Sequence, residues 1–269
     1  MGIWIADERE GLLRPGKAPV PCQPQCLCVC GDSVVCATAT GAVAFALEDG
    51  RELCRFPLPP GVRCLRALPG ALYCLSGEAD SVSLLCPRTG QLRLCAQAGC
   101  DPRDLAFGPG CRVLAAAGGA AGQLYLLDSA DLHLLRSIAL PGVVYAVCFC
   151  GAELMALCAV EAGDIQAGLY RISVRGVVTE LLRLPGLPGG LLALPGGGLL
   201  VGALGQLLQL RPGGGVQRRA PCALPARLRL YGDCVLCVDS LDGALLRFSL
   251  RDGRPVPLYR GAPVDALIV

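Results

Sequence analysis

The segment Asp104-Leu-Ala-Phe-Gly-Pro-Gly110 opens a series of four short apolar runs that ends at Gly142. The other three runs are Arg112-Val-Leu-Ala-Ala-Ala117, Gln123-Leu-Tyr-Leu-Leu-Asp128 and Leu134-Leu-Arg-Ser-Ile-Ala-Leu-Pro-Gly142. Apolar runs this short, separated by Gly, Pro and Asp, are typical of strands rather than helices. The segment therefore predicts one small antiparallel sheet of four strands.

The same pattern recurs along the whole chain at intervals of roughly forty residues, the length typical of four-stranded propeller blades. Its clearest marker is the turn between the third and fourth run, which falls at Pro15-Gly16, Asp49-Gly50, Thr89-Gly90, Ser129 to Asp131, Arg175-Gly176, Gly213 to Gly215 and Asp252-Gly253. Seven turns predict an all-β, seven-bladed β-propeller of four-stranded antiparallel blades.

The two chain ends are expected to complete one blade. The C-terminal Pro263-Val-Asp-Ala-Leu-Ile-Val269 is similar to the innermost run that begins at Pro102, and Ile5 to Arg14 parallels Val238 to Arg247. The N-terminus should then supply the outer three strands of the last blade, which removes the open sheet edges. We expect one domain, 1–269, with blades at about 25–61, 62–101, 102–142, 143–187, 188–226, 227–262, and 263–269 plus 1–24.

Three hairpin segments carry a family resemblance. They are Trp4-Ile-Ala-Asp-Glu-Arg-Glu-Gly-Leu-Leu13, Leu126-Leu-Asp-Ser129 and Cys237-Val-Asp-Ser-Leu-Asp-Gly-Ala-Leu245. These segments resemble the blades of YncE-like and NHL-type seven-bladed β-propellers. The resemblance implies the architecture over the whole chain, but such scaffolds carry many unrelated activities.

The composition bears on where in the cell the protein is expected to be found. The mean hydropathy is high, +0.53, but the uncharged stretch 184–210 contains three Pro and many Gly, so it should form strands rather than a membrane span. The first residues are acidic and lack the basic start and long apolar run of a secretory signal. We expect a cytoplasmic, monomeric protein without a membrane span.

The 18 cysteines have spacings that do not favour metal ligation. Cys26, Cys28 and Cys30 alternate along one predicted strand, and Cys234 and Cys237 should face opposite ways. The favoured interpretation is that Cys acts as a small buried hydrophobic residue; structural zinc and disulfides are the alternatives. We expect no metal and no cofactor.

The loops at the predicted upper end of the channel hold more acidic than basic residues. An acidic mouth would concentrate a cationic partner, such as a metal ion, an amine or a basic peptide. The alternative is that these carboxylates shape turns, and this is favoured for Asp7 and Asp239. The candidate ligand-binding residues at the channel mouth are Asp104, Asp265, Arg103, Arg63, Tyr145, Glu161 and Arg227.

Signals for catalysis or nucleic-acid binding are weak. The single His133 falls toward the periphery of its blade, where it is poorly placed as a general base. The chain has no Gly-x-Ser-x-Gly elbow, no phosphate-binding loop and no basic stripe with interleaved aromatics, so we expect no nucleic-acid partner. It also has no Asn to match the Asn and acidic metal ligands of gluconolactonase-type propellers.

Three functional hypotheses follow from the sequence. The first is a non-enzymatic binding or scaffold propeller that recognises a protein, peptide or small cationic ligand at an acidic upper face. The second is a lactonase-like hydrolase acting on a sugar lactone at the channel mouth, with Asp104, Asp265, Glu161 and Arg103 as its polar groups. The third is a structural element of a larger assembly, which would need a large exposed apolar patch.

Overall fold

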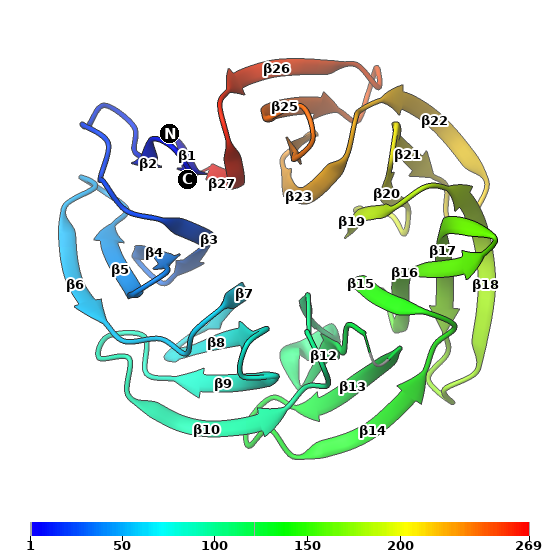
Figure 1. The fold of residues 1–269 in the computed structure, drawn as a ribbon, viewed down its shortest axis with the longest axis horizontal. Helices are drawn as coiled ribbons and strands as arrows, with labels where there is room; N and C mark the ends of the chain where they lie inside the picture. The colour runs from blue at the N-terminus through cyan, green and yellow to red at the C-terminus, as the bar shows by residue number, and fades with distance from the viewer. Residues whose placement is uncertain (1, 121, 269) are drawn as a thin grey trace.

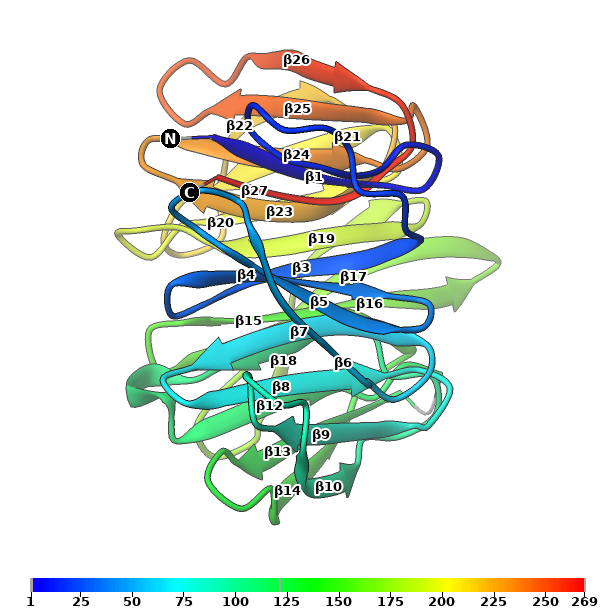
Figure 2. The same cartoon turned by 90° about the vertical axis from the view of Figure 1, so that its left-hand side faces the viewer.

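The computed structural model describes residues 2–120 and 122–268, and its strands form a ring of seven sheets around a central channel (Figure 1). The innermost strand of each sheet faces the channel, and the later strands lie progressively further out. In the edge-on view the inner strands lie roughly parallel to the axis of the channel (Figure 2). The prediction of a seven-bladed β-propeller is confirmed.

The first three blades are four-stranded and are built in chain order from the inside outward. Blade 1 contains β3 (Pro24–Cys30), β4 (Ser33–Thr38), β5 (Gly41–Ala46) and β6 (Glu52–Phe56). Blade 2 contains β7 (Val62–Leu68), β8 (Ala71–Ser76), β9 (Ser81–Leu85) and β10 (Leu92–Gln97). Blade 3 contains β11 (Leu105–Phe107), the 3-10 turn η1 (Pro109–Cys111), β12 (Val113–Ala117), β13 (Gln123–Asp128) and β14 (Leu134–Ala139).

The next three blades have the same topology. Blade 4 contains β15 (Val143–Cys150), β16 (Glu153–Ala162), β17 (Asp164–Ile172) and β18 (Val178–Pro185). Blade 5 contains β19 (Pro188–Ala193), β20 (Leu199–Ala203), β21 (Gln206–Leu210) and β22 (Val216–Pro221). Blade 6 contains β23 (Pro225–Tyr231), β24 (Cys234–Asp239), β25 (Ala244–Ser249) and β26 (Pro255–Arg260).

Blade 7 joins the chain ends, as the sequence predicts. Its inner strand β27 (Pro263–Ile268) pairs antiparallel with β1 (Ile3–Asp7), and β1 pairs with β2 (Gly11–Leu13). The N-terminal region supplies two named strands rather than three. A single bridge between Leu12 and Val20 stands in the place of the fourth strand, because Pro19 and Pro21 on either side of Val20 have no N–H to extend the ladder.

The hydrophobic core lies between the blades. One cluster, for example, joins Cys26, Cys28 and Cys30 of β3 to Leu65 and Cys74 of blade 2. Adjacent blades therefore bury their facing sheet surfaces against each other. Within the described residues, no helix is long and apolar enough to cross a membrane.

Candidate functional site at the channel mouth

The inner strands begin at one end of the channel, where a cavity of about 290 Å³ lies between their first residues. Its lining comes from five blades and the loops before them. The lining residues are Arg63, Asp101, Arg103, Tyr145, Pro188, Gly189, Leu224, Ala226 and Arg227. Four of these, Arg63, Arg103, Tyr145 and Arg227, are predicted site residues that the fold brings together from distant parts of the sequence.

The polar side chains of the mouth contact one another across the channel. Arg227 Nη2 donates to the carbonyl oxygen of Arg63 at 2.6 Å, although blades 6 and 2 are not neighbours. The Asp101 carboxylate accepts from Arg103 Nη2 at 2.8 Å and from Arg63 Nη2 at 3.3 Å. The Arg103 guanidinium carbon lies 4.1 Å from the centre of the Tyr145 ring, a cation–π contact.

Three arginines and one aspartate give the cavity wall an excess of positive charge. This corrects the expectation of an acidic mouth. The physical reason is that several acidic residues of the same region accept hydrogen bonds inside the structure, whereas the arginines line the opening. In addition, the buried Arg103 Nε has no hydrogen-bond partner among the described residues.

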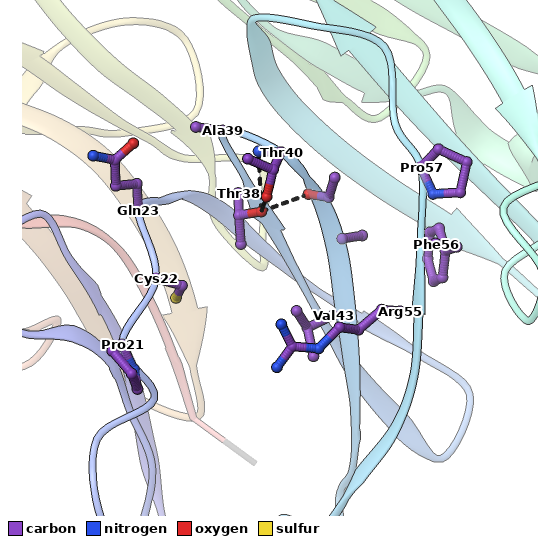
Figure 3. Close-up of a pocket in the computed structure, with 12 residues that line it drawn as sticks. Pro21, Cys22, Gln23, Thr38, Ala39, Thr40, Val43, Arg55, Phe56 and Pro57 are labelled. Atoms are coloured by element: carbon purple, nitrogen blue, oxygen red, sulfur yellow. Dashed lines mark hydrogen bonds between the residues drawn. The ribbon is translucent and has the colours of Figure 1, made fainter.

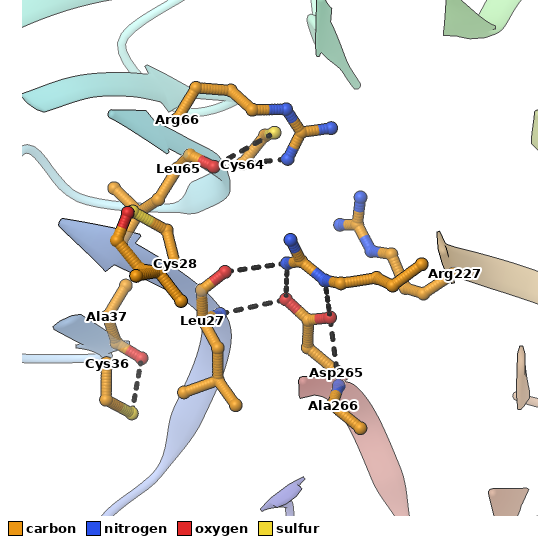
Figure 4. Close-up of polar contacts among 12 residues, drawn as sticks. Leu27, Cys28, Cys36, Ala37, Cys64, Leu65, Arg66, Arg227, Asp265 and Ala266 are labelled. Atoms are coloured by element: carbon orange, nitrogen blue, oxygen red, sulfur yellow. Dashed lines mark hydrogen bonds and ion pairs between the residues drawn. The ribbon is translucent and has the colours of Figure 1, made fainter. Parts of the chain in front are cut away.

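Asp265, a predicted ligand residue, is instead part of an inter-blade contact that we call an inner-strand clamp. It lies on β27 with 1 % of its surface exposed, and its Oδ2 accepts from the Leu27 N–H on β3 at 2.8 Å. Arg229 of β23 donates from Nε to Oδ1 at 3.1 Å and from Nη2 to Oδ2 at 2.6 Å. The clamp thus joins three successive blades, and Figure 4 shows Asp265 between Leu27 and Ala266 with Arg227 nearby.

Asp104 forms a second inner-strand clamp with the same parts. Its Oδ2 accepts from the Val147 N–H on β15 at 3.1 Å, and its Oδ1 accepts from Arg66 Nη2 of β7 at 3.1 Å. The Cys64 thiol adds a weak contact at 3.6 Å. Figure 4 shows Arg66 beside Cys64 at the channel wall. Blades 2, 3 and 4 are joined as blades 6, 7 and 1 are.

The electrostatics of Asp265 follow from this arrangement. Burial by itself raises the pKa of its carboxyl, but the charge and hydrogen bonds of Arg229, the charge of Arg227 and the Leu27 N–H outweigh burial and lower it. A carboxylate with its oxygens already occupied is a support for the channel wall rather than a free ligand group.

Asp7 and Asp239 hold turns, as expected from their positions in the hairpins. Asp7 Oδ1 accepts from the N–H groups of Arg9 and Glu10, and Asp239 Oδ1 accepts from the Leu224 N–H at 2.8 Å. For both, burial raises the pKa, while the backbone hydrogen bonds lower it by more. The oxygens of these two carboxylates are therefore already engaged by backbone N–H groups of the linkers and turns.

Two predicted features lie away from the mouth. Glu161 is exposed near the tip of the long β16–β17 hairpin and does not line the cavity. His133 lies on the exposed β13–β14 turn, where its Nδ1 is 2.6 Å from Asp131 Oδ1. With Asp128 these two residues form the one group of three close potential metal ligands found among the described residues. Hydrogen bonds from Ala130 and His133 to the two carboxylates shape that turn.

The cysteines are mostly packing residues. Ten of them are buried, including Cys26, Cys36 and Cys237, which agrees with their interpretation as small hydrophobic side chains. Three others are exposed on the surface: Cys95, Cys100 and Cys111. Cys234 and Cys237, expected to face opposite ways on one strand, have different surroundings: Cys234 contacts Asp233, whereas Cys237 lies 3.9 Å from the Cys222 sulfur.

Sequence reasoning missed the two clamp arginines, Arg66 and Arg229, and the lining residue Asp101 as a partner of the mouth arginines. The available signal for the two arginines was a second Arg within the same inner strand, after Arg63 in β7 and after Arg227 in β23. Asp101 is also unusual because its φ is +52°, a conformation held in part by the Asp80 carboxylate, which accepts its N–H at 2.8 Å.

The comparisons with known proteins agree on the fold. A proposed 6-phosphogluconolactonase from Bacteroides uniformis superposes with a TM-score of 0.77 at 12% identity, over 99% of this chain and 98% of that one. The virginiamycin B lyase of Staphylococcus aureus gives 0.72 at 15% identity, over 88% and 84%. The Pan2 WD40 domain of Neurospora crassa gives 0.67 at 12% identity, over 88% and 79%.

At these identities the likeness establishes the β-propeller architecture alone. No protein-family model matches the chain, and no curated protein matches it in sequence. The similar structures include enzymes and a WD40 domain, and they do not single out the YncE-like or NHL-type propellers.

Proposed function

We propose that this protein is a non-enzymatic binding propeller whose channel mouth holds a small anionic ligand carrying phosphate or carboxylate groups. The observation that carries the proposal is the meeting of Arg63, Arg103 and Arg227, from three blades, around one cavity of about 290 Å³. Among the described residues that line it, Asp101 has the one carboxylate. Guanidinium groups bind phosphate and carboxylate oxygens in a fixed fork geometry, which suits such a ligand.

The clamps support this role because they hold the channel wall still. Arg227 is half-buried beside the Asp265 clamp, and the nearby Asp265 and Asp104 charges raise its pKa against the opposing effect of burial. A cation that is fixed and partly desolvated interacts more strongly with an incoming anion than one on a mobile surface side chain.

The test is calorimetric titration with inorganic pyrophosphate and, separately, with citrate, which distinguish phosphate from carboxylate recognition. We expect saturable binding that weakens as salt increases, and a loss of about ten-fold or more in affinity for Arg103→Gln, since one charge-assisted hydrogen bond contributes about 1.5–3 kcal/mol. Arg219→Gln, an exposed arginine on the outer strand β22, is the matched control and should bind as the unchanged protein does.

Two results would reject the proposal. One is that neither anion binds at low salt. The other is that Arg219→Gln weakens binding as much as Arg103→Gln does, because this would mean that the overall charge of the protein, rather than the mouth, attracts the anion.

A hydrolase acting on a phosphorylated sugar lactone is the second candidate. The likeness to a proposed 6-phosphogluconolactonase and the arginine-lined mouth favour it. Lactone hydrolysis needs a group that activates water, and in the described lining the one carboxylate, Asp101, is already paired with two arginines. Turnover of 6-phosphogluconolactone that disappears in Asp101→Asn would replace the binding proposal with this one.

A further inference from the structure

A second opening lies on the outside of the ring, where the linker into blade 1 passes the end of that blade (Figure 3). It has a volume of about 650 Å³ and is lined by the linker 21–23, by the β4–β5 hairpin from Thr38 to Val43, and by Arg55 to Pro57 at the end of β6. It is separate from the channel mouth. We call it the thiol groove, because Cys22 forms part of its wall.

Two cysteines meet at the wall of this groove. Cys22, in the linker, is half-buried, while Cys36 of β4 is fully buried behind it. Cys22 packs against the buried cluster that contains Cys36, and the Cys36 thiol lies 3.6 Å from the Ala37 carbonyl oxygen. A half-buried thiol in front of a second, buried thiol is the arrangement that lets one sulfur react and the other complete a disulfide.

The surroundings of Cys22 favour its thiolate. The neighbouring Cys36 thiol, the Leu12 backbone and the positive charge of Arg55 together lower the pKa of Cys22 to about 7, against the opposing effect of burial. The neighbouring Cys22 thiol and burial raise the pKa of Cys36. Arg55 is itself held by Glu52, with contacts of 2.8 and 2.9 Å, and Figure 3 shows Arg55 on the Cys22 side of β6.

We propose that Cys22 is an oxidation site, at which a small peroxide enters the thiol groove and Cys36 resolves the product to an intramolecular disulfide. The Cys22 thiolate attacks one peroxide oxygen, the O–O bond breaks, and Cys22 becomes a sulfenic acid while the other oxygen leaves as water or an alcohol. The Cys36 sulfur then attacks the Cys22 sulfur, the sulfenic oxygen leaves as water, and two thiols have been oxidised as one peroxide is reduced.

The chain contains a matched pair that lacks these features. Cys237 occupies the position of Cys36 on the second strand of blade 6, and Cys222 lies in the linker before that blade, one residue further from the inner strand than Cys22 is in blade 1. The Cys222 and Cys237 sulfurs are 3.9 Å apart. Asp239 stands where blade 1 has Thr38, and its Oδ2 is 3.1 Å from the Cys222 sulfur. The Cys237 hydrogen bond, burial and the Asp239 carboxylate raise the pKa of Cys222, so this thiol should stay protonated.

The experiment is limited oxidation of the full chain with hydrogen peroxide at neutral pH, followed by alkylation of the remaining thiols and peptide mapping by mass spectrometry. We expect a Cys22–Cys36 disulfide to form about ten-fold faster than any Cys222–Cys237 disulfide, because the thiolate fraction is higher at Cys22. Cys36→Ala should accumulate a Cys22 sulfenic acid that dimedone traps, and Cys22→Ser should give neither product.

Two variants test whether the rate of Cys22 oxidation depends on the charges around its thiol rather than on the access of peroxide to the groove. Thr38→Asp introduces the carboxylate of blade 6 and should slow Cys22 oxidation several-fold, and Arg55→Gln should slow it less. Cys36→Ala is a mild change, since blades 3 and 4 have Ala116 and Ala156 at the corresponding position. A Cys22 that remains a thiol, or that pairs with another cysteine, in the folded unchanged protein overturns the proposal. Equal rates for the two pairs overturn it as well.

Discussion

Asp265 on β27 and Asp104 directly before β11 occupy corresponding positions of the repeat, yet their clamps differ in detail. Asp265 is 1 % exposed and receives both Nε and Nη2 of Arg229, whereas Asp104 is 7 % exposed and receives one nitrogen of Arg66. Arg229 also donates to the Leu27 carbonyl of blade 1 at 2.6 Å, beyond the blade that holds Asp265. Arg66 of blade 2 donates instead to the Leu105 carbonyl of blade 3, the same blade that holds Asp104.

The difference matches the positions of the two clamps in the ring. Blade 7 is closed by pairing of β27 with β1 from the other end of the chain, so it depends on noncovalent contacts. Blade 3 is a continuous four-stranded hairpin series. The more extensive clamp lies where the chain itself does not hold the blade together, and it is the one we expect to matter more for stability.

Removing each carboxylate should produce the largest effect. Asp265→Ala leaves Arg229 without its partner in the channel wall and should lower the free energy of unfolding by about 3–5 kcal/mol, whereas Asp104→Ala should cost about 1–3 kcal/mol. Urea unfolding followed by circular dichroism measures both. Equal losses would remove the link between clamp strength and ring closure.

A double variant sharpens the same comparison. Asp265→Ala combined with Arg229→Met removes both charges, so its loss should be smaller than that of Asp265→Ala alone, because no unpaired charge remains buried. If the double variant loses more than the single one, Arg229 stabilises the ring through contacts other than Asp265.

Acid should weaken the closing blade. The pKa of Asp265 is lower in the folded protein than the ordinary value of 3.8, so its stabilisation is present above about pH 4 and is lost as the pH falls through the folded pKa. Asp7 and Asp239 contribute in the same pH range because their pKa values are also lowered. Urea midpoints measured from pH 7 to pH 3 should fall less steeply below pH 4 in Asp265→Asn than in the unchanged protein, while a parallel fall would show that Asp265 does not titrate in this range.

Replacing the arginines by lysine should have a smaller effect. Lysine keeps the charge but cannot place two nitrogens on one carboxylate, so Arg229→Lys should cost about 1–2 kcal/mol. Arg66 places one nitrogen on the Asp104 carboxylate and donates its other hydrogen bonds to the neutral Leu65 and Leu105 carbonyls, so Arg66→Lys should cost less, about 1 kcal/mol. Thermal unfolding of the two variants side by side compares the clamps directly, and a larger loss for Arg66→Lys would reverse their order.

The smallest effect is expected at Cys64. Its thiol contacts Asp104 at 3.6 Å and makes only a weak hydrogen bond. Cys64→Ser keeps a donor at this position and should change stability by less than about 1 kcal/mol. Chemical unfolding with Asp104→Ala as the reference measures this, and a loss as large as that of Asp104→Ala would show that Cys64 is an essential part of the second clamp.

Much of the architecture could be predicted from local sequence. The spacing of turns such as Asp49-Gly50 and Thr89-Gly90 sets the number of blades, because each turn follows from residue types that favour tight reversals. The channel-mouth position of Arg63, Arg103, Tyr145 and Arg227 followed from the same repeat. The sign of the charge at the channel mouth could not be predicted, because the sequence alone does not show which carboxylates are engaged in hydrogen bonds inside the structure.

The repeat pattern of short strands and turns thus determined by itself the ring, its seven blades and the pairing of its two ends, because strand periodicity and turn chemistry are local properties. Only the tertiary structure decided which charges pair. Arg229 with Asp265, Arg66 with Asp104, and Cys22 with Cys36 come from separate segments. Burial and hydrogen bonding, which set the charge of the mouth and the acidity of the thiols, depend on those long-range contacts.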